Sequence, residues 1–206
     1  MKRPGMFLLG VAALAAAWWG PLAELAQHAF YGHMAVHMTV VAGAAPFLAL
    51  GLAGGNWDPI RRWPDCCSPL VASMLELVVV WLWHMPLLHE AAGRSGAAMA
   101  AEQGSFLASG FLLWISVFGG SPERRAERGA IGIVALLLTL MHMTLLGALL
   151  ALSPRPLYAH HSGAAGLSPL QDQELGGAIM LVVGSVSYIA GALWLTSRLL
   201  LRPRRY

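Results

Sequence analysis

The sequence predicts an all-α membrane protein, a polytopic bundle of about six transmembrane helices. Of its 206 residues, 57% are hydrophobic and only 11% are charged, whereas charged residues make up about 25% of soluble domains. The hydrophobic residues come in runs of roughly 18 to 25, the length that a helix needs to cross a ~30 Å hydrocarbon core. No segment between the runs is long enough for a separate soluble domain, so residues 1–206 are predicted to form one bundle.

The predicted spans alternate with connecting segments that are rich in helix breakers and charges. In chain order the spans cover residues 6–26, 31–53, 69–88, 103–119, 130–152 and 176–201. The later connections are GGNWDPIRRWPDCCS, EAAGRSGAAMAAE, GSPERRAERG and SPRPLYAHHSGAAGLSPLQDQ. Gly20 and Pro21 predict a kink within the first span.

The first span has a second interpretation. Lys2 and Arg3 precede an apolar stretch in which residues 13–15 are small enough for a signal-peptide cleavage site. Trp18 and Trp19 follow at once, and the apolar stretch continues beyond them. These bulky residues favour a retained helix over a cleaved secretory signal.

Lysine and arginine are distributed unequally between the two sets of span ends. One set holds Lys2, Arg3, Arg61, Arg62, Arg124, Arg125, Arg128, Arg198, Arg202, Arg204 and Arg205. The other set holds only Arg94 and Arg155. Since positive residues that flank spans stay in the cytoplasm, we predict a bacterial inner-membrane protein with both termini cytoplasmic. The net charge of +3 then reflects topology and attraction to anionic lipid, and nucleic acid binding, which needs a concentrated basic surface, is not indicated.

Histidines gather on the opposite, periplasmic side. In this topology all eight lie outside the membrane or in its outer half, namely His28, His33, His37, His84, His89, His142, His160 and His161. Ionisable residues within a bilayer are costly and usually face the bundle interior, where a partner, a metal or water satisfies them. Three different spans contribute such a histidine, which predicts a shared site.

Methionines accompany these histidines. His33 and His37 are four residues apart, so they share a helix face about 6 Å apart, and Met34 and Met38 repeat that spacing on an adjoining face. Imidazole and thioether together suit Cu(I) better than they suit hard cations, which prefer oxygen. The pattern favours a Cu(I) site that is open to exchange.

The predicted ligands are His33, His37 and His84, with His142 or a methionine completing the site. His142 lies several ångströms deeper than His37 by the helical rise, so it could instead orient a ligand. A histidine at the membrane interface, such as His89, more often bonds at headgroup level, and we do not predict it as a ligand.

Two acidic residues are also candidates for the site. Glu76 lies roughly 10 Å deep in the third span, where a carboxylate is protonated or paired and could join helices. Asp172 lies at the outer start of the last span, where it could cap a helix or act near the metal. The pair Gly176 and Gly177 that follows would let a neighbouring helix approach closely.

Several motifs together resemble the CtaG family of cytochrome c oxidase assembly factors. Residues 32–38, GHMAVHM, followed by APFLALG, are similar to its HMxxHM signature and apolar tail. The family's WHxP turn, its SFLASGxxxW stretch and its fifth-span exit are matched by residues 83–86, by residues 105–114 and by LLGALLALSPRPLY. Asp172-Gln173 with Gly176-Gly177 and Met180 is similar to its DQxxGGxxM motif, and the resemblance covers about residues 28–195.

The resemblance implies a role in maturing a haem-copper oxidase. The implied partners are cytochrome c oxidase subunits and a periplasmic copper donor, together with membrane lipid. On this hypothesis the protein receives Cu(I) at the periplasmic face and passes it to an oxidase subunit. The chain is short for the family, and Gln103 stands where we expect many relatives to carry a histidine, which argues against a ligand from the fourth span.

Two other classes of function stay open at this point. One is a haem-binding electron carrier, because a membrane bundle can hold haem between histidines on facing spans, here His37 and His142. The other is a metal-free partner that docks an oxidase subunit. The sequence does not indicate an enzyme, since no nucleophile stands beside a base and carboxylate and no phosphate-binding glycine loop occurs.

Overall fold

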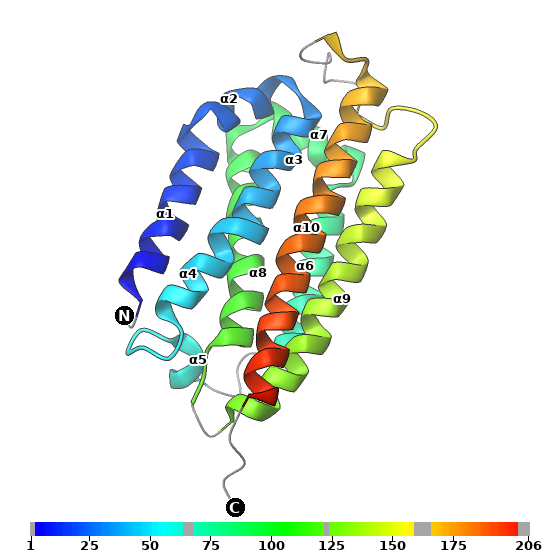
Figure 1. Ribbon diagram of the computed structural model, residues 1–206. Helices are drawn as coiled ribbons and strands as arrows, with labels where there is room; N and C mark the ends of the chain where they lie inside the picture. The colour runs from blue at the N-terminus through cyan, green and yellow to red at the C-terminus, as the bar shows by residue number, and fades with distance from the viewer. Residues whose placement is uncertain (1–2, 64–67, 122–123, 159–165, 202–206) are drawn as a thin grey trace, which may run out of the picture.

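The computed structural model describes residues 3–63, 68–121, 124–158 and 166–201, and across these ranges it contains helices and no strand (Figure 1). The helices are α1 (Pro4–Trp19), α2 (Pro21–His28), α3 (Phe30–Met38), the π-helix η1 (Thr39–Ala44), α4 (Ala45–Leu52), α5 (Pro59–Arg62), α6 (Pro69–Trp83), α7 (Pro86–Arg94), α8 (Gly96–Phe118), α9 (Arg125–Ala151) and α10 (Pro169–Leu200). The predicted all-α fold class is confirmed.

Three continuous helical stretches are long and apolar enough to cross a membrane. They are Phe30–Leu52, Ala126–Ala151 and Pro169–Leu200. Two bent pairs, α1 with α2 and α6 with α7, raise the number to five if each pair is one span. The predicted fourth span corresponds to α8, whose early turns carry the polar run Glu102-Gln103-Gly104-Ser105 and so lower its apolar character. Six spans and their orientation stay predictions.

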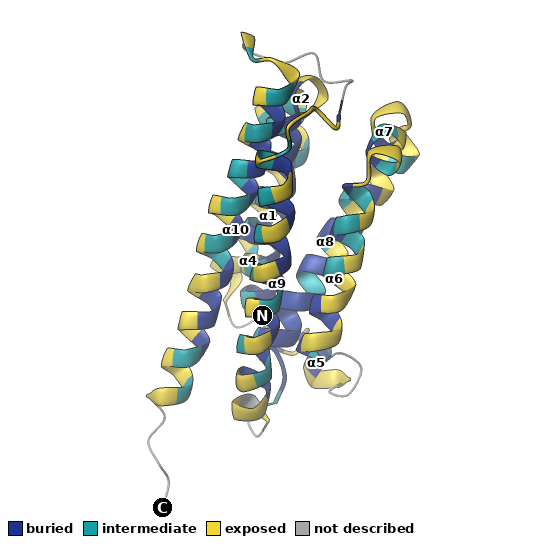
Figure 2. Cartoon of the chain, turned by 90° about the vertical axis from the view of Figure 1, so that its right-hand side faces the viewer, coloured by how far each residue is buried: buried dark blue, intermediate teal, exposed yellow. Residues whose placement is uncertain are grey.

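The long helices pack side by side (Figure 1). α1 begins and α10 ends at the end that also carries α5, whereas α2 and α7 lie at the opposite end (Figure 1). Exposed residues lie on the outer sides of α6 and α10, and buried ones lie between the helices (Figure 2). Many of the exposed residues are apolar, for example Val186 and Leu193 of α10. An apolar outer surface is suited to contact with lipid.

The two bent pairs break where the sequence carries proline. α1 and α2 meet at Gly20, before Pro21, at 41°, which confirms the predicted kink. α6 and α7 meet at His84 and Met85, before Pro86, at 73°. Proline cannot donate a backbone hydrogen bond and moves the preceding residue out of the helical region. The second bend turns α7 back across the end of the bundle.

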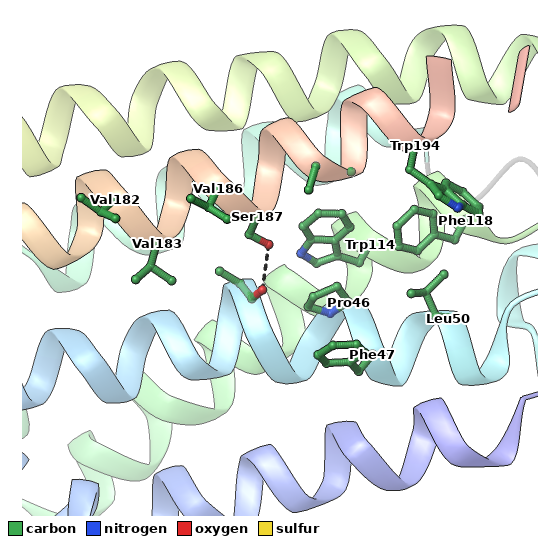
Figure 3. A pocket seen from close by; sticks show the side chains of 13 residues that line it. Pro46, Phe47, Leu50, Trp114, Phe118, Val182, Val183, Val186, Ser187 and Trp194 are labelled. Atoms are coloured by element: carbon green, nitrogen blue, oxygen red, sulfur yellow. Dashed lines mark hydrogen bonds between the residues drawn. The ribbon is translucent and has the colours of Figure 1, made fainter. Parts of the chain in front are cut away.

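The π-helix η1 interrupts the second predicted span, which the sequence analysis did not foresee. Pro46 has no N–H to donate to the carbonyl oxygen of Ala42, four residues earlier. The Ser187 hydroxyl donates to that oxygen instead, at 2.7 Å (Figure 3), and the Trp114 indole N–H donates to the neighbouring Val41 oxygen at 3.0 Å. Side chains from α10 and α8 therefore satisfy the carbonyls that the π-helix exposes.

Two glycines allow α10 to approach its neighbours, as predicted. A Cβ atom on Gly176 would lie 2.6 Å from Cδ1 of Phe30 in α3, and one on Gly177 would lie 2.6 Å from the backbone nitrogen of Ala151 in α9. Neither position has room for a larger residue. Close packing at this level fixes α3, and with it His33, against α10.

Candidate metal centre

Three buried residues from three helices bring potential ligand atoms together. His33 of α3, His89 of α7 and Glu102 of α8 offer two imidazole nitrogens and a carboxylate oxygen that all lie within 4.8 Å of one another. His33 and His89 are each 8% exposed and Glu102 is 2% exposed. The His33 Nε2 atom lies 3.8 Å from Glu102 Oε1. Two histidines and a glutamate form a ligand set that binds transition metals in proteins.

The imidazoles continue inward from this group as a row. Between ring centroids, His33 lies 4.7 Å from His89 and 6.4 Å from His84. His84 in turn lies 5.3 Å from His37. The exposed fraction falls to 5% at His84 and 0% at His37. The Phe106 ring packs 4.1 Å from His37 and 6.0 Å from His84, so the inner part of the row is walled by aromatic carbon.

The orientation of His84 leaves one nitrogen suited to a metal. Its Nδ1 atom lies 2.6 Å from the carbonyl oxygen of Val80. Because a carbonyl oxygen only accepts, Nδ1 carries the proton and donates, and Nε2 keeps its lone pair. Within the described part of the chain Nε2 has no hydrogen-bond partner. Metal-binding histidines commonly have this arrangement, with the second nitrogen bonded to a carbonyl.

Glu102 is oriented by its neighbour in sequence. The Gln103 side-chain amide donates to Glu102 Oε2 at 3.3 Å, and the Gln103 oxygen accepts from the Trp18 indole at 3.2 Å. Glu102 Oε1 faces His33 and accepts no hydrogen bond from the residues that the structure describes. The chain Trp18–Gln103–Glu102 thus directs one carboxylate oxygen toward the imidazoles.

An aromatic pair covers the cluster. Tyr158 and Phe30 stack at 4.4 Å, and the His89 ring lies 4.6 Å from Tyr158 and 5.6 Å from Phe30. The Tyr158 phenol donates to the carbonyl oxygen of His84 at 2.6 Å. Burial, with the nearby Glu102 carboxylate, raises the pKa of Tyr158 above its ordinary value, so the phenol stays protonated as a donor.

Asp172 and Gln173 place the parts that surround the cluster. The Asp172 carboxylate accepts from the backbone nitrogens of Phe30 at 2.9 Å and Tyr31 at 2.8 Å. It therefore caps α3 and not its own helix. Gln173 accepts from the Leu157 nitrogen at 2.6 Å and donates to the Leu150 oxygen at 3.0 Å, which fixes the segment that carries Tyr158.

Of the predicted ligands, the structure brings His33, His37 and His84 into one row. It places the two methionines elsewhere, since a Cβ atom on Gly176 would lie 3.0 Å from Cγ of Met34 and one on Gly184 would lie 3.4 Å from Cε of Met38. Consecutive helical residues are about 100° apart around the axis. That rotation turns these thioethers toward α10 while the imidazoles face α6, α7 and α8.

His142 is buried in α9. It makes no ring contact with the four imidazoles within the described ranges, and both of its nitrogens lack a hydrogen-bond partner there. Its part in metal binding stays a prediction. His160 and His161 lie outside the described residues.

A comparison with models of protein families decides the family of this chain. The model described as cytochrome c oxidase caa3 assembly factor (Caa3_CtaG) matches residues 1–201. The chain belongs to this family. The match covers nearly the whole sequence and confirms the resemblance inferred from its motifs. Curated proteins and solved structures were also compared, and neither comparison gave a match.

In this Caa3_CtaG protein Glu76 belongs to a separate polar group, deeper in the bundle. It is fully buried, and its Oε1 atom accepts from the Tyr188 phenol at 3.1 Å. Ser73 lies on the same helix face, where its hydroxyl is 2.8 Å from that of Thr139 in α9. These contacts link α6 to α9 and α10, in line with the helix-joining role considered from the sequence.

Two members of the cluster in this Caa3_CtaG protein were not predicted as ligands. His89 was assigned to the membrane interface, but the 73° bend before α7 returns it to the bundle. Glu102 lies beside Gln103, the residue that argued against a ligand from the fourth span, yet α8 contributes this carboxylate to the group. The available signal was the position of Glu102 directly before the predicted fourth span, on the same side of the membrane as the histidines.

Proposed function

We propose that this member of the caa3 oxidase assembly family binds a copper ion at His33, His89 and Glu102 and passes it to a cytochrome c oxidase subunit. The observation that carries the proposal is the convergence of these three buried side chains within 4.8 Å. The copper is cargo here, received from a periplasmic donor and released to the oxidase. The protein has no catalytic step of its own in this proposal.

Two of the potential ligand atoms are buried and make no hydrogen bonds with the described residues, which favours metal binding. Glu102 Oε1 and His84 Nε2 are buried without a hydrogen bond from the described residues, and unsatisfied buried polar groups cost about 1–3 kcal/mol each. A metal ion coordinated by these atoms would remove that cost. His84, next in the row, is the fourth ligand that we propose.

The chemistry of the ligand set indicates which oxidation states of copper the site could bind. Imidazole suits copper and zinc, whereas a carboxylate is a harder ligand than the thioether that favours Cu(I). With Met34 and Met38 packed toward α10, the group of His33, His89 and Glu102 suits Cu(II) as well as Cu(I). We propose copper because the family serves an oxidase that contains it.

The orientation of the site follows from charge. Arg61 and Arg62 lie in α5, Arg3 directly precedes α1, and Arg198 lies in the last turn of α10. The start of α1 and the end of α10 lie at the end of the bundle that carries α5, whereas α7, which contains His89, lies at the opposite end (Figure 1). By the positive-inside rule, we infer that the imidazole row opens toward the periplasm of the inner membrane. That is the side on which an oxidase subunit would receive copper.

The test measures copper in the full chain, purified in detergent under reducing conditions and loaded with copper. Wild type is compared with the His33→Ala/His89→Ala double variant and with Glu102→Gln. His28→Ala is the matched control, because His28 is exposed at the end of α2. We expect near-stoichiometric copper in wild type and in the control. Loss of a residue that only hydrogen-bonds to a metal ligand lowers metal affinity by ~10- to 100-fold, and we expect the variants to lose more copper affinity than that.

The outcomes separate the remaining classes of function. Unchanged copper content in the double variant would refute the ligand assignment. A Soret band in the same sample would favour the haem-binding carrier. Copper-free, colourless protein that still captures an oxidase subunit in the presence of a chelator would favour the metal-free docking role.

A further inference from the structure

Two hollows lie near the arginine-rich end of the bundle, away from the imidazole row. The first is an apolar groove of about 500 Å³ between α4 and α10, with Trp114 of α8 at its floor (Figure 3). The second is a pocket of about 530 Å³ whose lining includes Arg3, Arg128 and Arg198. Both volumes fall in the ~300–1,000 Å³ range of small-molecule sites.

The two hollows adjoin each other. Leu50, Phe118 and Trp194 line both of them. A molecule could therefore place an apolar part in the groove and a polar part among the arginines without leaving the protein surface. This shape matches an amphiphile.

Charge narrows the choice of amphiphile. Three guanidinium groups line the pocket, and the described residues that line it include no carboxylate. Arg198 lies over the Trp194 ring at 5.0 Å, and Arg128 donates to the carbonyl oxygen of Ser116 at 3.5 Å. Guanidinium groups bind phosphate through paired hydrogen bonds. The pocket is therefore suited to an anionic phosphate headgroup.

The length of the groove fits an acyl chain. Its lining runs along α10 from Val182 to Trp194, a distance of about 18 Å at the helical rise. Half of a ~30 Å hydrocarbon core is about 15 Å. The groove thus extends from the arginines to near the middle of a bilayer, the path that one leaflet's acyl chain follows.

We propose that the adjoining groove and pocket together bind one anionic phospholipid, with its phosphate among Arg3, Arg128 and Arg198 and an acyl chain along α10 over Trp114. The lipid would cover the region where α10 stands away from α4, beside the Ser187 bond to the π-helix. It would also join the start of α1 to the end of α10. This site is separate from the proposed copper site.

The test measures phospholipid retained by the full chain, delipidated in detergent and titrated with phosphatidylglycerol or phosphatidylcholine before native mass spectrometry. Arg198→Gln should weaken phosphatidylglycerol binding about fivefold, the value of about one arginine at an anionic lipid surface. Arg62→Gln is the matched control, since Arg62 also lies over a tryptophan ring, Trp63, at 5.3 Å. We expect no change in the control.

A second pair of variants tests the groove. Ala190→Trp fills it, because Ala190 is exposed and lines it, and should lower retention of phosphatidylglycerol. Leu193→Trp is its control, since Leu193 is 64% exposed on the same helix and is not part of the lining. Thermal unfolding of all four variants in detergent without lipid should match wild type, which excludes misfolding as the cause.

Several results would overturn the proposal. Equal retention of phosphatidylcholine would mean that the arginines do not select the headgroup. Displacement of the lipid by glycerol phosphate alone would mean a phosphate site without an acyl-chain groove. Equal losses in Arg62→Gln and Arg198→Gln would mean general surface attraction. Unchanged lipid retention in Ala190→Trp, with loss of a co-purifying oxidase subunit, would assign the groove to a protein helix.

Discussion

The Tyr158 phenol donates a 2.6 Å hydrogen bond to the backbone carbonyl oxygen of His84, and this bond joins the segment after α9 to the bend between α6 and α7. The bend determines where both His84 and His89 lie. Tyr158 is thus fixed over the imidazole row by a contact to the same turn that forms the row. We therefore expect access to the proposed metal site to depend on this contact.

Tyr158→Phe should loosen that cover without removing its ring. The variant keeps the stack on Phe30 but loses one buried hydrogen bond, which we expect to lower the free energy of unfolding by about 1 kcal/mol. Copper should pass to an external chelator faster than from wild type. Thermal unfolding and chelator competition measure the two effects, and an unchanged release rate would show that Tyr158 does not limit access.

Asp172→Ala should destabilise the start of α3. The carboxylate accepts two backbone hydrogen bonds there, from Phe30 and Tyr31, and loss of a helix cap costs about 0.5–2 kcal/mol. Asp172→Asn keeps one acceptor oxygen and should lose less. The order wild type, Asn, Ala in thermal stability is the expected result; equal stability of all three would contradict the capping role.

Ser187→Ala tests the explanation of the π-helix. The variant removes the donor to the Ala42 carbonyl oxygen, and hydrogen bonds between membrane helices contribute about 0.6 kcal/mol on average and about 1.7 at most. In a Pro46→Ala background the restored N–H can bond that oxygen, so Ser187→Ala should cost less there. A double-mutant cycle of unfolding free energies gives the coupling, and additive losses would contradict the explanation.

The spacing of His33 and His37 could be read from the sequence because both lie on one helix, where geometry is local. The inclusion of His84 followed from its place at a predicted span end. His89 was missed because its position depends on the angle of the bend at Met85 and Pro86, and a sequence shows that a break occurs without showing its angle. The kink at Gly20 could likewise be predicted from the sequence, but its angle could not.

The methionines show a different limit of sequence reasoning. Met34 and Met38 repeat the spacing of His33 and His37, but which of two adjoining helix faces meets α10 depends on packing across the bundle. Gly176 allowed α10 to approach the methionine face. The sequence indicated a close approach at this glycine and did not identify its partner, which the structure shows to be α3.

Gln103→Ala should weaken metal binding although Gln103 is not a proposed ligand. Gln103 donates to Glu102 Oε2 and so directs Oε1 toward His33. Without that bond the carboxylate can rotate, and loss of an outer partner of a metal ligand typically costs about 10- to 100-fold in affinity. We expect copper stoichiometry to persist at saturating metal while competition with a chelator shows a loss of about tenfold.

Trp18→Phe is the control for that variant. It removes the indole N–H that donates to the Gln103 oxygen, together with part of the ring, and leaves the Gln103 amide bond to Glu102 in place, so its effect on affinity should be smaller. Equal affinity losses would mean that packing of α1 against α8, and not the direction of the carboxylate, governs the site. Glu102→Gln removes the carboxylate charge itself, so it should lower copper affinity more than Gln103→Ala or Trp18→Phe does. This order of the three affinities follows only if Glu102 binds the metal.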